Sequence, residues 1–184
     1  EFEVPGIAEL TQNQNGVWEY TSVPLEPELY SYSFIVNGQR MNDPSNVYQI
    51  RDVATVTSIF IVGGGQADLY KVSDVPHGTV SKVWYDSPSL GMRRRMTVYT
   101  PAGYENNGKA RDPLLYLLHG MGGDEQPRME LGRAPQILDN PIAHRQDKPM
   151  IEVMPNANAS QQAPPGETSH CLVPPQSAHP KTTD

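Results

Sequence analysis

The sequence contains a single cysteine, Cys171, no long apolar run and few positive charges. One cysteine excludes an intrachain disulfide and any metal site built from cysteines. The mean hydropathy is −0.54, and no stretch approaches the roughly 20 apolar residues that a membrane-spanning helix requires. The 14 basic and 21 acidic residues give a net charge of −7, which leaves a nucleic-acid or anionic-membrane partner without electrostatic support.

The one cluster of positive charge is the run Arg93-Arg94-Arg95. Because the run is short and lies in a predicted strand, we expect two of these side chains to be solvated. The third is expected to extend its apolar stem along the surface and keep its charge in water.

Prolines are abundant and unevenly placed. Ten of the 18 fall in residues 1–140 and eight in the last 44, whereas the usual share of proline is about 5%. The C-terminal quarter is therefore predicted to be loop, or a segment without its packing partners. The sequence begins with Glu1 and lacks a signal-peptide pattern, so we expect that a signal peptide has been removed or that a longer protein precedes it.

Residues 1–62 have the pattern of short strands separated by turns. From Tyr30 to Val36, large apolar residues alternate with smaller ones, which is typical of a half-buried strand. Asn37-Gly38 follows directly and is a strong hairpin signal, and residues 53–62 are rich in β-branched side chains. With no helical period, this part favours a small β-sandwich.

A different organisation follows Gly63-Gly64-Gly65. Strands are predicted at residues 79–85, 94–100 and 150–155, and the apolar run Leu114 to Leu118 is typical of a strand buried on both faces of a parallel sheet. Glu152 places a charge inside such a strand, which is costly unless the charge is paired.

Residues 124–146 are predicted to form a crossover helix, but three prolines lie within it. Pro127 fits a first helical turn. Pro135 and Pro141 each remove a backbone hydrogen bond, at about 3 kcal/mol in a helix interior. The helix is therefore expected to be broken, kinked or shortened.

The segment His119-Gly120-Met121-Gly122-Gly123 directly follows the apolar run. Glycines let a backbone pass close to a ligand, and their N–H groups can face a developing negative charge. This arrangement is related to the oxyanion loop of α/β-hydrolases. The alternative is a glycine-rich turn from strand to helix in which His119 only packs.

Several segments together resemble the carbohydrate esterases of family 1, the esterase D/feruloyl esterase group. The front half is similar to the immunoglobulin-like N-terminal domain of those enzymes, which is itself similar to carbohydrate-binding modules. The segments that carry the resemblance are Met96 to Tyr104, Leu114 to Gly123, Val153 to Asn156, Trp18 to Tyr20, Tyr30 to Phe34 and Asp43 to Asn46.

The resemblance implies an immunoglobulin-like β-sandwich over residues 1–64, a linker over 65–77 and the N-terminal portion of an α/β-hydrolase domain over 78–184. It implies a secreted or periplasmic bacterial serine esterase that removes feruloyl or acetyl groups from arabinoxylan, with no cofactor or metal. Its partner would be plant polysaccharide or a feruloylated oligosaccharide. In this family, backbone N–H groups from two segments donate to the oxyanion. The resemblance assigns only one of them within this sequence, the N–H of Met121, with Gly120 and Gly122 shaping the loop.

A catalytic serine is not recognisable. None of the twelve serines lies in a Gly-x-Ser-x-Gly motif, and the family order places aspartate or glutamate and then histidine after the serine. His119 belongs to the loop, and His170 and His179 come too early in that order. We therefore predict that the nucleophile, base and acid lie outside this chain and that the chain alone is not a competent esterase.

The aromatic residues of the front half allow two interpretations. Trp18, Tyr20, Tyr30 and Tyr48 could stack on sugar rings, but aromatic residues alternating along strands more often form core or cross-strand pairs. The alternative function is a non-catalytic carbohydrate-binding or interaction module.

Overall fold

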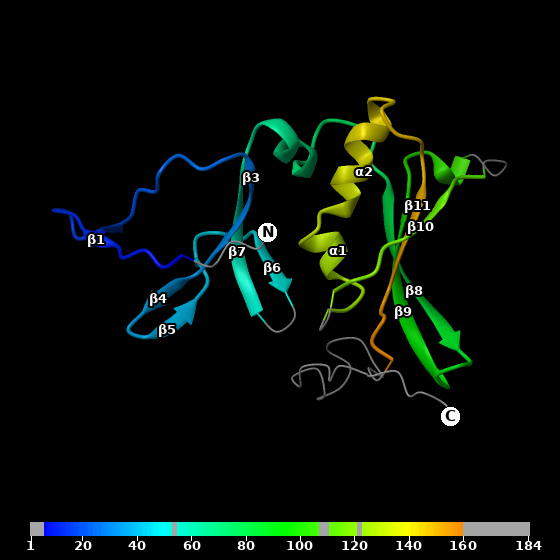
Figure 1. Ribbon diagram of the computed structural model, residues 1–184, viewed down its shortest axis with the longest axis horizontal. Coiled ribbons are helices and arrows are strands. Elements are labelled where there is room, and N and C mark those ends of the chain that lie inside the picture. Colours follow the sequence, from blue (N-terminus) through cyan, green and yellow to red (C-terminus); the bar gives the residue numbers. More distant parts are fainter. Residues whose placement is uncertain (1–5, 53–54, 107–110, 121–122, 160–184) are drawn as a thin grey trace.

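The computed structural model describes residues 6–52, 55–106, 111–120 and 123–159. They form a three-stranded and a four-stranded β-sheet and two two-stranded hairpins, and a layer of two short helices lies between the two larger sheets (Figure 1). Within these ranges, no helix is long and apolar enough to cross a membrane.

The front sheet has three antiparallel strands in the order β3-β7-β6, and two hairpins accompany it. The second hairpin turns at Asn37-Gly38, as predicted, with Asn37 at a φ of 50°. The strands of this half are β1 (Thr11–Gln12), β2 (Trp18–Glu19), β3 (Glu28–Tyr32), β4 (Phe34–Val36), β5 (Gln39–Met41), β6 (Gln49–Asp52) and β7 (Thr55–Val62).

Aromatic side chains hold the front sheet together across its strands. The ring of Tyr30 stacks on that of Phe60 with 5.4 Å between centroids, and Tyr32 meets Phe60 edge-on at 5.8 Å. The front half is thus built of strands, as predicted. A sandwich of two packed sheets is not confirmed and stays a prediction.

A 3₁₀ helix, η1 (Gly65–Tyr70), lies within the segment predicted to be a linker. Its end contacts the helix layer through main-chain oxygens. Asn140 Nδ2 donates to the carbonyl oxygens of Leu69 (3.0 Å) and Lys71 (3.1 Å), and Arg133 Nε donates to that of Tyr70.

The second sheet has four strands in the order β10-β11-β9-β8. β10 and β11 are parallel, whereas β9 is antiparallel to both β11 and β8. These strands confirm those predicted from the sequence: β8 (Thr79–Ser87), β9 (Met92–Thr100), β10 (Leu114–Tyr116) and β11 (Ile151–Pro155), with a 3₁₀ turn, η2 (Tyr104–Asn106), after β9.

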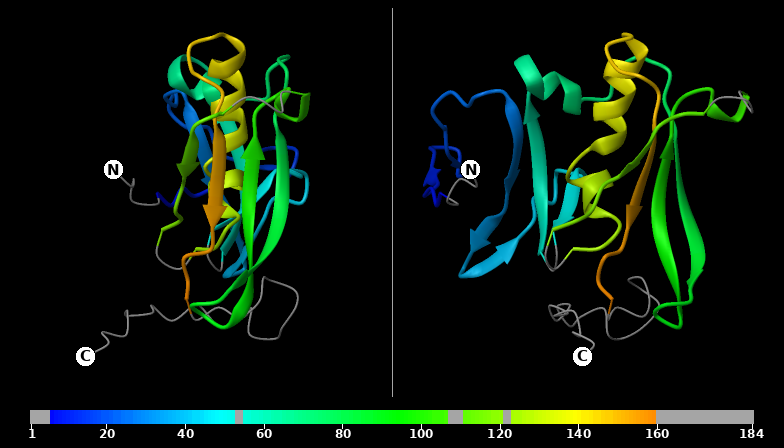
Figure 2. Two further views of the ribbon diagram at one scale, coloured as in Figure 1. Left: turned by 90° about the vertical axis from the view of Figure 1, so that its right-hand side faces the viewer. Right: turned by 45° about the vertical axis from the view of Figure 1, so that its right-hand side comes forward.

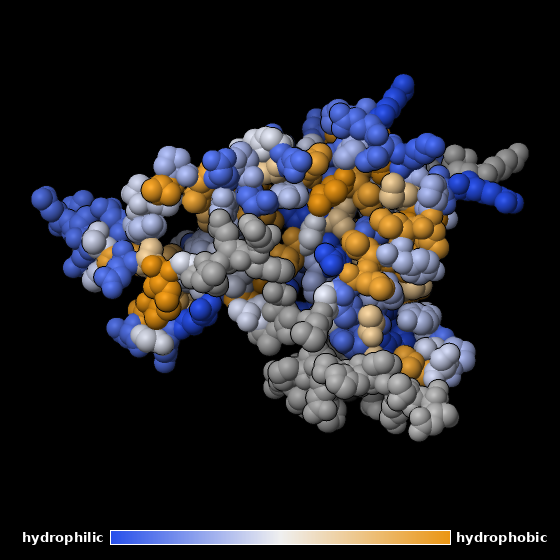
Figure 3. Space-filling view, viewed as in Figure 1, coloured by the Kyte–Doolittle hydropathy of each residue, from blue (hydrophilic) through white to orange (hydrophobic). Residues whose placement is uncertain are grey.

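The prediction that Leu114 to Leu118 is buried on both faces is wrong for the structure described. Leu114 is 51% exposed, Tyr116 62% and Leu118 54%. The reason is position, because β10 is an edge strand of the described sheet and has a partner only in β11. Hydrophobic surface accordingly gathers around β10 and β11 in the space-filling view (Figure 3).

The predicted crossover helix is broken in two, as its prolines led us to expect. Helix α1 spans Pro127–Glu130 and helix α2 spans Ala134–Ala143. Between them Arg133 adopts left-handed backbone angles, with φ 49° and ψ 35°. Pro135 then sits in the first turn of α2, where a missing N–H costs nothing. Pro141 lies inside the last turn, and the helix continues only to Ala143.

The helix layer packs against the four-stranded sheet on one side and meets the front sheet on the other (Figure 2). Its core against the sheet consists of Tyr99, Ala134 and Met154. Leu117, Met129 and Leu138 are partly buried around that core. The α1–α2 segment therefore connects the two sheets.

Asp139 of α2 fixes the helix to the beginning of β8. Its carboxylate is 5% exposed and accepts hydrogen bonds from Tyr99 Oη (2.7 Å) and the Gly78 N–H (2.9 Å), while His77 Nδ1 lies 2.9 Å away. Burial first, and then the hydrogen bond to Asp139, raises the pKa of Tyr99 far above its ordinary value. The phenol therefore remains a donor to this carboxylate.

Replacing Asp139 should be strongly destabilising. Asp139→Ala leaves the buried Tyr99 hydroxyl and the Gly78 N–H without their acceptor, at about 1–3 kcal/mol each. We expect the free energy of unfolding in urea to fall by about 2–4 kcal/mol. Asp86→Ala is the control, since the Asp86 side chain is 83% exposed and its ion pair with Arg93 spans 3.4 Å. Equal losses in both variants would contradict the role of Asp139.

Glu152 of β11 is buried, as expected from its place in the strand, and is 2% exposed. Within the described part of the chain its Oε2 atom has no hydrogen-bond partner. Burial raises the pKa of Glu152, and the charge of Arg128 opposes this only in part. The carboxylate form is thus disfavoured in the folded protein.

This predicts a defined pH dependence of stability. The folded protein holds the Glu152 proton to a higher pH than the unfolded chain, whose glutamates titrate near pH ~4.3, so stability is lost as pH rises through that interval. Glu152→Gln should unfold at a higher temperature than wild type at neutral pH, and the difference should vanish below about pH 4. A variant that is less stable than wild type at neutral pH and equal to it in acid would refute this.

Candidate oxyanion loop

The candidate site is the segment from residue 119 to 123, which connects β10 to the residues preceding α1. Met121 and Gly122, two of the three predicted loop residues, lie outside the described residues. Gly120 is described and exposed, and a Cβ atom placed on it would meet no atom of the described residues within 4 Å, its chain neighbours aside. The backbone at Gly120 is therefore open to an approaching ligand.

His119 links this loop to the loop that follows β11. The Ala157 N–H donates to His119 Nε2 at 2.8 Å, and His119 Nδ1 lies 2.6 Å from the Gly120 carbonyl oxygen. Since Nε2 accepts a hydrogen bond, the proton of the neutral ring is on Nδ1, which donates to Gly120. Both ring nitrogens are engaged, so His119 could take a proton from a serine only by losing its bond to Ala157.

A second set of contacts joins the same two loops. Asn158 Nδ2 donates to the Gly123 carbonyl oxygen, and the Gly123 N–H donates to that of Gly120 at 3.2 Å. A Cβ atom on Gly123 would lie 3.1 Å from His119 Nδ1, which is tighter than ordinary van der Waals contact. The glycine at 123 thus allows the close approach of the His119 ring.

Arg94 of β9 supports the loop after β11 and is only 4% exposed. Its Nη1 donates to the Asn158 carbonyl oxygen at 2.8 Å, and its Nη2 donates to that of Asn156 at 2.6 Å. A charged group hydrogen-bonded to two carbonyls holds this backbone in place.

Arg95, the next residue, lies on the opposite face of β9 and contacts Glu125, just after the candidate oxyanion loop. Its Nε donates to Glu125 Oε1 at 2.7 Å, and its Nη2 lies 2.6 Å from the same oxygen. The side chains are 12% and 1% exposed. Asn156 Nδ2 adds a hydrogen bond to Glu125 Oε2 at 3.2 Å, so this pair also connects the two loops.

The prediction of two solvated arginines in the run was therefore wrong. Of the three, only Arg93 is largely solvated, with a side chain that is 71% exposed. Arg94 is 4% exposed and the Arg95 side chain is 12% exposed. The signal that was missed is the alternation of a strand. Adjacent residues point to opposite faces, so a run of three arginines in a covered strand must place a charge inside. Trp84 of β8 packs against this row, with the guanidinium carbons of Arg93 and Arg95 5.9 and 5.8 Å from its ring centroid.

Asp124, which precedes Glu125, contacts the front sheet. Its Oδ2 lies 2.5 Å from Arg51 Nη2, and its side chain is 4% exposed. Its Oδ1 accepts a hydrogen bond from the Gln126 N–H at 3.0 Å, just before α1 begins. Sequence reasoning did not find Arg51, because nothing local indicates a pair separated by 73 positions.

The predicted aromatic residues of the front half differ in their surroundings. Tyr30 packs on Phe60 and donates its hydroxyl to the Glu26 carbonyl oxygen at 2.9 Å. Trp18, Tyr20 and Tyr48 are 62%, 58% and 71% exposed. Tyr30 thus agrees with the packing interpretation, while the other three rings are available to solvent.

Chemically, the site is a glycine-containing loop. Its C-terminal end is held by two ion pairs, through Asp124 and Glu125, and its first residue, His119, accepts a hydrogen bond from the Ala157 N–H. Main-chain N–H groups in such a loop can stabilise an oxyanion without reorganisation. Among the described residues, no group of three or more histidine, cysteine, aspartate or glutamate side chains is placed to hold a metal ion.

No protein-family model matches the chain. The sequence is similar to an endo-1,4-β-xylanase/feruloyl esterase of Xylanibacter ruminicola, with 34% identity over 150 residues. The similarity covers 79% of this chain and 20% of the relative. The chain therefore spans about one fifth of the length of this curated relative.

Among solved structures, the enterobactin esterase of Shigella flexneri shares the fold, with a TM-score of 0.53. Its sequence is 18% identical, and the match covers 76% of this chain and 40% of that one. A ferulic acid esterase of Anaeromyces mucronatus, in complex with ferulic acid, matches at 25% identity and a TM-score of 0.44, over 68% of this chain and 39% of its own.

The Arg95–Glu125 pair yields a stability prediction. Glu125→Ala leaves the guanidinium of Arg95 buried without its partner, so we expect the free energy of unfolding to fall by about 3–5 kcal/mol in urea denaturation. The double variant Arg95→Met/Glu125→Leu should recover most of that loss, because it removes both charges.

Arg93→Ala is the matched control. Arg93 is the exposed neighbour in the same run, and it should cost less than about 1 kcal/mol. A double variant no more stable than Glu125→Ala would show that the pair contributes more than its charges.

Proposed function

We propose that this chain, which resembles the carbohydrate esterases of family 1, is part of an enzyme that hydrolyses feruloyl or acetyl esters on plant cell-wall polysaccharide. The observation that carries the proposal is the 34% identity to a protein named as a xylanase and feruloyl esterase. The glycine loop at the carboxyl end of β10 is consistent with that chemistry.

In the proposed reaction, a serine attacks the ester carbonyl with a histidine as base, and an aspartate or glutamate orients that histidine. The main-chain N–H of Met121, in the loop shaped by Gly120 and Gly122, donates to the carbonyl oxygen as it becomes negative. The lack of a Gly-x-Ser-x-Gly motif in the sequence, and the engaged ring of His119, support a nucleophile and base outside these 184 residues. This chain then supplies oxyanion stabilisation and the scaffold beneath it.

As part of the same proposal, the front half is an immunoglobulin-like domain over residues 1–64, and the hydrolase portion occupies residues 78–184. The substrate is arabinoxylan or a feruloylated oligosaccharide derived from it, and the enzyme that meets it is secreted or periplasmic. This substrate class is supported by the name of the relative, endo-1,4-β-xylanase/feruloyl esterase.

Gly120 offers a direct test in the longest natural polypeptide that contains this sequence. A Cβ atom at this position meets none of the described residues beyond its chain neighbours, so we expect Gly120→Val to fold and its side chain to keep the ester carbonyl away from the backbone. We expect kcat for methyl ferulate to fall about 10²–10³-fold, the usual effect of losing one oxyanion donor. Gly6→Val, also in open space, is the control.

Two results would overturn the proposal. One is the absence of hydrolysis of methyl ferulate and of acetylated xylan by the unsubstituted polypeptide. The other is an unchanged kcat in Gly120→Val. For the nucleophile, turnover by these 184 residues alone, abolished by a serine-directed inhibitor, would refute its placement elsewhere.

The second candidate function is glycan binding by the front half, which the exposure of Trp18, Tyr20 and Tyr48 favours. Exposed aromatic rings stack on sugars, and Tyr30 is excluded from this set by its packing on Phe60. Affinity electrophoresis in arabinoxylan distinguishes the candidates, since retardation that is lost in Trp18→Ala would support binding and unretarded migration would remove it.

A further inference from the structure

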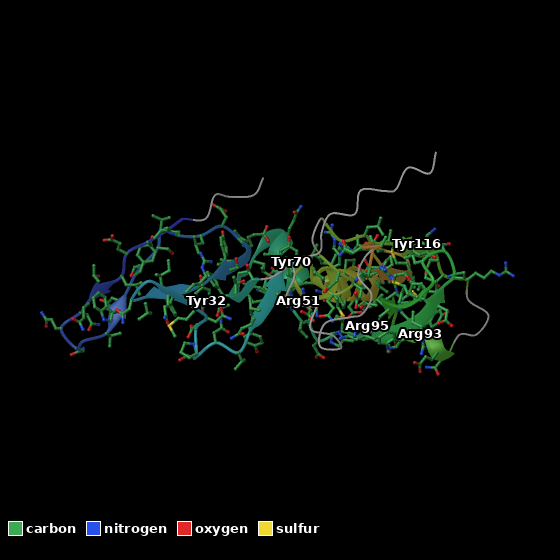
Figure 4. All side chains as sticks on the ribbon, turned by 90° about the horizontal axis from the view of Figure 1, so that it is seen from below. Tyr32, Arg51, Tyr70, Arg93, Arg95 and Tyr116 are labelled. Carbon is green, nitrogen blue, oxygen red and sulfur yellow. The ribbon has the colours of Figure 1, made fainter. Side chains whose placement is uncertain are left out.

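Two adjacent buried carboxylates, Asp124 and Glu125, end the candidate oxyanion loop, and each is paired with an arginine from a different sheet. Glu125 pairs with Arg95 of β9. In the four-stranded sheet, β9 lies next to β11. Asp124 pairs with Arg51 of β6, in the front sheet. Seen from below, Arg51 lies at the front sheet and Arg95 at the four-stranded sheet (Figure 4). The end of the loop is thus held between the two sheets.

The pair with Arg51 fixes the backbone as well as the side chain of Asp124. One carboxylate oxygen accepts the Gln126 N–H, and the other lies 2.5 Å from Arg51 Nη2. With both oxygens engaged and the side chain 4% exposed, the carboxylate cannot turn to water without breaking a bond. The Arg51 side chain is 28% exposed, so the pair is shielded from the full screening of solvent.

In the ranges that the structure describes, this pair is one of two attachments between the front half and the helix layer. A separate attachment lies at η1, where Asn140 and Arg133 of the α2 region donate to three main-chain oxygens of residues 69–71. The loop end and the η1 end are therefore two different contacts between the same parts. The contact at the loop end can be removed while the other remains.

We propose that Arg51 is a positioning residue that acts through Asp124 to hold the described residues of the oxyanion loop, His119, Gly120 and Gly123, in their conformation. The front sheet is then part of the catalytic scaffold, in addition to any contact it makes with polysaccharide. The inference rests on the proposed function for the meaning of the loop, and deepens it by assigning a role to the front sheet within the reaction.

The His119 ring provides a probe of the loop that needs no substrate. In ¹⁵N spectra of the histidine-labelled chain, wild type should show protonated Nδ1 and unprotonated Nε2 for His119, assigned by its loss in His119→Gln. In Arg51→Ala, we expect these two shifts to move toward those of a ring that exchanges between tautomers. The Ala157 amide, which donates to Nε2, should exchange with solvent about tenfold faster or more.

Two further variants separate positioning from general loosening. Asn140→Ala weakens the η1 attachment and leaves the Arg51–Asp124 pair intact, so the His119 spectrum should stay as in wild type. Arg51→Lys keeps the charge and should restore most of the wild-type spectrum. If Arg51→Ala does not fold, Arg51→Gln, which keeps most of the stem, takes its place in the same comparison.

An unchanged His119 spectrum and Ala157 exchange rate in Arg51→Ala would overturn the proposal. Changes of equal size in Asn140→Ala would also overturn it, since any weakening of the interface would then suffice. Because neither measurement involves an ester, a failed esterase assay leaves this result standing. An active enzyme with an unaffected loop in Arg51→Ala would reject only the role of Arg51.

Discussion

The burial of two neighbouring carboxylates after a glycine loop is the constraint on which the arrangement of this protein depends. A carboxylate removed from water must be paired, because its desolvation costs several kcal/mol. Asp124 and Glu125 meet this requirement with arginines from two different sheets. The sheets and the helix layer therefore converge at one place, which is the place where the sequence carries its most informative motif.

The break in the helix layer serves the same convergence. A continuous helix over the predicted range would have one direction throughout. The left-handed residue at Arg133 instead lets α1 and α2 take separate directions, and Pro135 begins the second helix without a lost hydrogen bond. α1 can then stay with the loop end and β6, while α2 is fixed to β8 through Asp139 and to η1 through Asn140. The prolines thus favour two short helices in place of one, and each helix contacts a different part of the molecule.

Local patterns were sufficient to predict most of the elements, because they report on the backbone near each residue. The Asn37-Gly38 turn and the prolines of the crossover each predicted what the structure contains. The alternation from Tyr30 to Val36 predicted one strand, which the structure divides at Ser33 into β3 and β4, in different sheets. Features set by distant neighbours were not predictable. The burial of Arg94 and Arg95 depends on carbonyls and a carboxylate brought from elsewhere in the chain. The pairing of Arg51 has no local signal, and the exposure of β10 reflects strand order. For the candidate site, sequence indicated the loop but not the ion pairs that hold it.

The edge position of β10 has a consequence for the persistence of the loop. In the described part of the chain, β10 pairs with its sheet on the β11 side alone, through three residue pairs and two flanking backbone hydrogen bonds. Leu114 and Leu115 remain 51% and 42% exposed. Opening free energies vary widely within one protein, and segments with few buried contacts lie at the low end. The loop begins shortly after this strand ends, so fraying of β10 would release the His119 end of the loop, whatever the strength of the ion pairs at Asp124 and Glu125.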